Sequence, residues 1–167
     1  MYNTIDEFVV EWNEERNYTQ KVLDALTDSS LQQQVSPNDR TLGRIAWHIV
    51  TSVPSMLSKF GFDVETVPDS ATVQSSAKEI TEGFQKISAG TIDIVRKQWT
   101  DESLKDIRNV FGMDLPNAVI LSLLIKHIIH HRGQMTVLMR QAGLKAPGVY
   151  GPAREEWAAI GMEAPPM

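Results

Sequence analysis

Three of the four histidines lie together in the longest apolar run of the sequence, residues 117–142. In a helix of ~3.6 residues per turn, His127 and His131 share one face, whereas His130 points roughly 80° away from their mean direction. Two imidazoles at this spacing can bind one metal ion. The segment is not an H-E-x-x-H motif, because Ile128 stands where the glutamate would be. The spacing alone leaves two possibilities open, a metal site and a pair of satisfied core histidines.

The fourth histidine, His48, lies beside the apolar stripe of another helical pattern. If it faces His127 and His131, three neutral imidazoles would leave at least one position open on an ion such as Zn²⁺ or Ni²⁺. An open position is typical of catalytic rather than structural coordination. The alternative is that His48 bonds a buried hydroxyl or carbonyl group.

Other polar residues could take part in such a site. Arg132 and Gln134 follow the histidine pair and could orient the ligands or a substrate, or they could be solvated helix residues. Asp39, Glu155 and Glu156 lie near the predicted mouths of the bundle. A carboxylate that reached the open side of the ion would favour an enzyme.

Hydrophobic periodicity and capping residues predict four long helices, at about residues 4–27, 41–60, 76–99 and 117–142. Pro54 is expected to kink or reset the second helix, because it lacks an N–H group and crowds the preceding turn. Gly133 costs the fourth helix ~1 kcal/mol relative to alanine, so either another backbone passes close by or the cost is tolerated. The connections are longer than is usual in bundles, so at least one can cross over the bundle.

The remaining segments carry weaker patterns. Residues 100–113 predict a short extended piece or an irregular connection, and no sheet. Residues 144–167 form a loop-rich tail with one short helix near residues 154–159. Tyr150 and Trp157 are expected to dock this tail on the bundle, the alternative being an exposed partner-binding tail.

A length of 167 residues with 42% hydrophobic residues indicates one domain over residues 1–167, and the four predicted helices make it all-α. The absence of cysteine excludes disulfides, thiolate ligands and a cysteine nucleophile, so thiol chemistry would need a thiol brought by the substrate. A net charge of −5 without a Lys/Arg cluster argues against nucleic-acid binding. We expect no membrane span and, from the acidic N-terminus, a cytoplasmic protein.

Three motifs together resemble the DinB-like family across the whole chain. They are GRIAWHIV around His48, HIIHHRGQ from His127 to Gln134, and YGPAREEW from Tyr150 to Trp157. The resemblance implies a four-helix bundle with up-down-down-up connectivity and frequent homodimers. It also implies a divalent metal, Zn²⁺ or Ni²⁺, held by His48, His127 and His131 and not by His130. Members of this family include transferases and isomerases that use low-molecular-weight bacterial thiols such as bacillithiol and mycothiol.

Two classes of function remain open. In the first, which we favour, the metal lowers the pKa of a bound thiol or water, which then attacks a small electrophile in thiol transfer or hydrolysis. The pocket is then expected at one end of the bundle, with residues 150–157 as a wall. In the second, the protein is a metal-binding stress-response module without turnover, and the missing general base is compatible with it.

Overall fold

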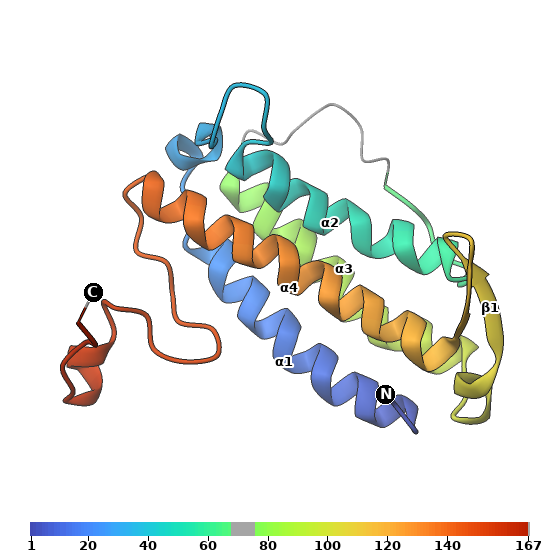
Figure 1. Ribbon diagram of the computed structural model, residues 1–167. Coiled ribbons are helices and arrows are strands. Elements are labelled where there is room, and N and C mark those ends of the chain that lie inside the picture. Colours follow the sequence, from blue (N-terminus) through green and yellow to red (C-terminus); the bar gives the residue numbers. More distant parts are fainter. Residues whose placement is uncertain (68–75, 167) are drawn as a thin grey trace.

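Four long helices make up most of the chain (Figure 1), and the computed structural model describes residues 1–67 and 76–166. The side chains of Thr4, Thr41 and Ser76 cap the first three helices, each by accepting a hydrogen bond from the backbone three residues on. The prediction of four helices is confirmed, and the one sizeable difference is that α1 ends earlier than residue 27. The helices are α1 (Ile5–Asp24), α2 (Leu42–Lys59), α3 (Ala77–Gln98) and α4 (Asn117–Gln141).

The helices form a bundle in which α1 and α2 lie diagonally opposite, each packed against both α3 and α4. The backbone N–H of Ile5 donates to Asp101, which brings the start of α1 to the end of α3. The N–H of Asp63, just after α2, donates to Gln98 at the end of α3, so α2 and α3 end at the same side. Figure 1 shows α4 beside α1 and running in the same direction. The connectivity is therefore up-down-down-up, as the resemblance implied.

A two-stranded antiparallel hairpin closes one end of the bundle, where the sequence predicted no sheet. Its strands are β1 (Ile107–Val110) and β2 (Met113–Pro116). Phe111 and Gly112 between them both have left-handed backbone conformations, with φ of 55° and 79°. Two such residues match the tight turns that suit the twist of a hairpin. Of the two alternatives for residues 100–113, the extended piece is the one found, and the prediction of no sheet was wrong. This hairpin borders the candidate site described below.

Two expected irregularities in the helices have different outcomes. The expected reset at Pro54 does not occur, because α2 continues as one helix from Leu42 to Lys59. Most of its residues around Pro54 are buried, so tertiary packing outweighs the missing hydrogen bond. No neighbouring atom of the described chain lies within 4 Å of a Cβ built on Gly133. No second backbone therefore approaches it, and its helix cost is tolerated.

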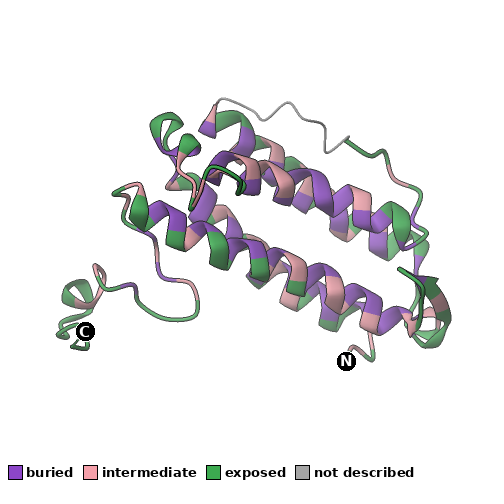
Figure 2. Ribbon diagram, turned by 45° about the horizontal axis from the view of Figure 1, so that its top comes forward, coloured by how far each residue is buried: buried purple, intermediate pink, exposed green. Residues whose placement is uncertain are grey.

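The core is built from the facing stripes of the four helices, as the burial colours of Figure 2 show. Trp12 is fully buried between α1 and α3, and its indole N–H donates to the carbonyl of Ser88 over 2.9 Å. Phe8, Phe60 and Phe84 are buried equally completely. No helix in the described part of the chain is long and apolar enough to cross a membrane.

The C-terminal segment after α4 is largely exposed (Figure 2) and contacts the bundle at a few points. The ammonium of Lys21 on α1 donates to the carbonyl of Gly148 over 3.1 Å. The hydroxyl of Tyr150 reaches buried groups of the bundle, although 66% of Tyr150 is exposed. The predicted short helix is a 3₁₀ turn, η3 (Trp157–Ile160), in which no residue is buried. Tyr150 therefore anchors this segment, and Trp157 is not part of the core.

Candidate metal centre

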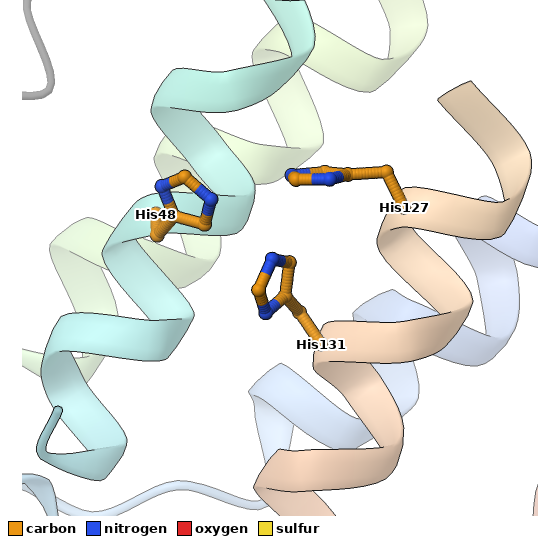
Figure 3. Close-up of side chains that lie close together, drawn as sticks. All are labelled: His48, His127 and His131. Carbon is orange, nitrogen blue, oxygen red and sulfur yellow. The ribbon is translucent and has the colours of Figure 1, made fainter. Parts of the chain in front are cut away.

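Three histidines from two helices face one another across the bundle (Figure 3). His48 comes from α2, and His127 and His131 come from α4, with ring centroids 4.5 to 5.2 Å apart. One nitrogen of each ring lies within 4.8 Å of the other two. A Zn²⁺ ion bound at ~2.0–2.1 Å from each nitrogen needs separations of about 3.3 Å, which small rotations of these side chains supply. The structure thus brings together the three histidines that the sequence singled out.

Hydrogen bonding around the rings fits a cation at their centre. Nε2 of His127 is buried and has no hydrogen-bond partner among the described residues. Such a buried orphan atom is rare unless a ligand satisfies it. Nδ1 of His131 lies 2.7 Å from Oε1 of Gln134, and this amide oxygen can only accept. Nδ1 of His131 then carries the proton, and its Nε2 lone pair is left for an ion, the usual outer-shell arrangement of metal-binding histidines.

The electrostatic environment keeps the imidazoles of His127 and His131 neutral. Burial, together with the neighbouring His131 and His48 rings, lowers the pKa of His127 to about 4. Burial also lowers the pKa of His131, although its hydrogen bond to Gln134 acts in the opposite direction. Both lone pairs are therefore available at neutral pH, and protons compete with a cation for His127 only near pH 4. Three neutral donors would leave the charge of the ion uncompensated by the protein.

The histidines separate two grooves on the face shared by α2 and α4. The hairpin-side groove, of about 640 Å³, is bordered by His48, His127 and the hairpin tip. The second groove, of about 520 Å³, contains His131, Gln134 and Asp39. The site therefore lies along the side of the bundle, and the prediction of a cleft at its end was wrong. Residues 150–157 line neither groove, so the expected wall was wrong as well.

Of the three candidate carboxylates, Asp39 alone lines a groove that reaches a site histidine. Its Oδ2 accepts a hydrogen bond of 2.6 Å from the hydroxyl of Ser36, and the residue is exposed. Glu155 instead accepts from Arg140 over 2.9 Å, and its pKa is lowered chiefly by a backbone hydrogen bond. Glu156 accepts from backbone N–H groups of the C-terminal segment. Glu155 and Glu156 thus hold that segment and are not near the ion site.

His130 is exposed and borders the hairpin-side groove. Its ring centroid is 4.9 Å from that of His131, yet it is not in the group whose nitrogens converge. Within the described residues, no fourth histidine or carboxylate completes the group of three. An ion held here would therefore keep open positions toward the grooves.

Arg132 follows His131 directly but faces α1. It neither orients the site histidines nor is solvated, the two roles that the sequence suggested. Its guanidinium lies 2.7 Å from the carboxylate of Glu15, and both side chains are almost fully buried. It also donates to Thr19 over 3.1 Å and to the hydroxyl of Tyr150 over 2.7 Å. Glu15 is 117 positions away in the sequence, so no local sequence pattern predicts this pair. Gln134, in contrast, does contact a site histidine.

The chain is thus an all-α four-helix bundle in which three histidines of α2 and α4 face one another. The model of the DinB family matches residues 1–165, and the chain belongs to this family. The chain is 44% identical to YrdA of Bacillus subtilis over 167 residues, which is 100% of both chains.

Solved structures agree with this assignment. A DinB-like protein from Bacillus cereus is 50% identical, with a TM-score of 0.83 over 90% of this chain and 100% of that chain. YfiT from Bacillus subtilis is described as a probable metal-dependent hydrolase with an unusual four-helix bundle topology. It is 17% identical, with a TM-score of 0.65 over 84% of this chain and 89% of its own, so the likeness to YfiT concerns the fold alone.

Proposed function

We propose that this protein is a divalent-metal-dependent transferase that joins a low-molecular-weight thiol to a small electrophile. The observation that carries the proposal is the group of three facing imidazoles beside two grooves, with an unpartnered buried Nε2 on His127. We propose Zn²⁺ or Ni²⁺ as the ion, because both accept imidazole ligands readily.

The residues of the site have two roles in this proposal, holding the cation and orienting a ligand ring. His48, His127 and His131 hold the cation, and Gln134 fixes the orientation and tautomer of His131. A divalent ion held by neutral ligands supplies Lewis acidity, which lowers the pKa of a thiol or of water toward neutrality. The thiol proton passes to solvent, the sulfur forms a bond to the electrophilic carbon, and the leaving group departs with its electron pair. The sulfur must come from the substrate, because the chain contains no cysteine.

Hydrolysis is the second candidate, and two observations favour it. The structurally similar YfiT is described as a probable metal-dependent hydrolase. Asp39 borders the same groove as His131 and offers a carboxylate that could accept a proton from an attacking water.

One assay separates these functions. Protein purified without a nickel column is analysed for metal, loaded with Zn²⁺ or Ni²⁺, and incubated with cysteine-derived thiols and 1-chloro-2,4-dinitrobenzene. Transfer predicts conjugate formation faster than in the His127→Ala variant. Cleavage of a nitrophenyl ester without any thiol would favour hydrolysis instead. If the loaded protein does neither faster than His127→Ala, the protein is a metal-binding module without turnover and the proposal fails.

We further propose that the protein acts as a homodimer in the cytoplasm, as the family resemblance implies. Two-fold dimers are the commonest oligomers of soluble proteins. Light scattering that gave the mass of one chain, 18.7 kDa, across micromolar concentrations would contradict the dimer.

A further inference from the structure

A further pocket, the C-terminal pocket, lies between the end of α4 and the C-terminal segment. Its lining is drawn from residues 140–145, 154–157 and 164–165. Gly143, with φ of 78°, follows the end of α4 and lets the chain turn there. The pocket encloses about 740 Å³, a volume usual for sites that bind small molecules. In Figure 1 this end of α4 lies opposite the hairpin.

The C-terminal pocket is separate from the histidine site. Arg140 lies nine residues after His131, which is about 13 Å along the axis of α4. None of the three site histidines is among the described residues that line the pocket. A ligand held here therefore does not occupy the ion site.

The lining of this pocket is mainly cationic. Arg140, Lys145 and Arg154 contribute three positive charges, and Glu155 contributes the one carboxylate among the described lining residues. The lining thus has a net charge of +2, in a chain whose formal net charge is −5. The C-terminal end of a helix carries only about half a negative elementary charge, so these cations exceed what the end of α4 can balance. A pocket of one sign concentrates ligands of the opposite sign.

Glu155 holds two of these cations in place. Its Oε1 accepts hydrogen bonds from Arg140 over 2.9 Å and from Arg154 over 3.3 Å. Both arginine side chains remain partly exposed, by 43% and 60%. A guanidinium has five N–H donors, so a contact to one carboxylate oxygen leaves donors of Arg140 available to a ligand. Oε2 of Glu155 is buried and has no hydrogen-bond partner among the described residues, which is uncommon in a cluster that is complete by itself.

Trp157 gives the pocket a flat apolar surface. It begins η3, in which no residue is buried, so packing in the core does not account for this large side chain. An indole ring is a good platform for flat rings, because stacking uses the π-face that every such ring offers. The pocket therefore combines an aromatic surface with several cations.

From this charge and shape we infer that the C-terminal pocket binds a phosphate monoester that carries a flat ring, as a mononucleotide does. Such a phosphate carries a charge of about −1.5 to −2 near pH 7, which complements the charge of the lining. The planar guanidinium groups suit phosphate oxygens, and Lys145 adds a point charge. The ring stacks on Trp157. The inference is independent of the proposed function, because the pocket lies away from the three histidines.

The test compares adenosine monophosphate with adenosine, which has the same ring and no phosphate, in calorimetry on the Zn²⁺-loaded protein. The wild type should bind the monophosphate more tightly. In the double variant Lys145→Gln, Arg154→Gln, the monophosphate should bind roughly five- to tenfold more weakly, the size expected when two exposed charge contacts are removed. The affinity for adenosine should change little. The matched control is Arg96→Gln, Lys97→Gln, which makes the same change of charge at exposed positions of α3 and should leave both affinities unchanged.

A second variant tests the aromatic surface. Trp157→Leu keeps an apolar side chain but removes the indole ring. The affinity for adenosine monophosphate should fall at least about fivefold, the smallest effect expected when a stacked base loses its aromatic platform. Ribose phosphate, which has no flat ring, should bind the variant and the wild type equally. Because Trp157 is not part of the core, the urea midpoint should stay as in the wild type.

The outcomes distinguish this pocket from the ion site. The metal-free His127→Ala variant should bind adenosine monophosphate as tightly as the Zn²⁺-loaded wild type. Binding that requires the metal, or that survives the Lys145→Gln, Arg154→Gln substitutions, would place the phosphate elsewhere and overturn the inference. Equal affinities for the monophosphate and adenosine, or no binding of the monophosphate at millimolar concentration, would overturn it as well. The conjugation assay probes the other site, so the transferase proposal can fail while this inference holds.

Discussion

Two neighbouring residues of α4 belong to polar clusters of opposite character. His131 faces α2 and joins a group of three imidazole rings in which Nε2 of His127 has no hydrogen-bond partner among the described residues. Arg132 faces α1, where Glu15 neutralises its charge and Tyr150 adds a further hydrogen bond. The charge of Arg132 is balanced within the chain, whereas three imidazoles converge without a carboxylate among the described residues. The comparison assigns the first cluster to the stability of the fold and leaves the second as the candidate metal site.

The largest expected effect comes from breaking the Arg132 cluster. Arg132→Met would leave the carboxylate of Glu15 buried without its partner, and should lower the free energy of unfolding by about 3–5 kcal/mol in urea titrations. The matched control is Arg96→Met, which removes a contact of the same 2.7 Å length to Asp6 on the surface. Because both partners there are exposed, the loss should stay below about 1 kcal/mol. Similar losses in the two variants would contradict a structural role for the Arg132 cluster.

Breaking the histidine cluster should affect metal affinity. His131→Ala removes one of three ligands, so Zn²⁺ affinity should fall at least about 100-fold, more than outer-shell changes cause. Competition with a chromophoric chelator measures it. His130→Ala, one position before, should leave the affinity nearly unchanged. A loss with His130→Ala as large as with His131→Ala would show that the ligands are misassigned.

A smaller change tests how the histidine cluster is oriented. Gln134→Ala removes the acceptor 2.7 Å from Nδ1 of His131, and Zn²⁺ affinity should fall by about tenfold through loss of ring orientation. Gln134 is exposed, so the urea midpoint of the metal-free protein should hardly move. Gln141→Ala, at the exposed end of α4, is the control. Equal affinities of the two variants would mean that Gln134 does not position His131.

The smallest expected effect is at Gly133, the residue that follows Arg132 on α4. Gly133→Ala should raise the free energy of unfolding by up to about 1 kcal/mol, because the added Cβ meets no atom within 4 Å. Metal affinity should be unchanged. Gly83→Ala on α3 should gain less, since its Cβ would lie 3.3 Å from a methyl group of Val50. Thermal unfolding of both variants measures the difference, and a destabilised Gly133→Ala would reveal a constraint that the packing does not show.

The sequence predicts one cluster much better than the other, for a physical reason. His127 and His131 are one helical turn apart, so periodicity alone places them together. Glu15 and Arg132 are 117 positions apart and meet only because α1 and α4 pack side by side. Local spacing does not predict such a pair. From the sequence, Arg132 was expected either to be solvated or to orient the site histidines or a substrate.

The same distinction explains the rest of the fold. The four helices carry their own signals in capping residues such as Thr4 and Ser76 and in apolar periodicity, so their bounds were predictable. The hairpin has strands of four residues each, too short to show a period, and it depends on packing at the bundle end, where Val110 is buried. Phe111 and Gly112 were its best local signal, a glycine at the second position of a tight turn. The Tyr150 anchor again depends on the distant Glu15.

An ion among the three histidines would also act as a cross-link in a chain without cysteines. His48 on α2 and the histidine pair on α4 are far apart in sequence, with the whole of α3 between them. Joining them closes a loop of roughly 80 residues, for which chain-entropy arguments give a stabilisation of about 4–5 kcal/mol. Unlike a disulfide, this closure responds to metal supply and not to redox conditions. Chelation would therefore loosen the contact between α2 and α4 beside the two grooves.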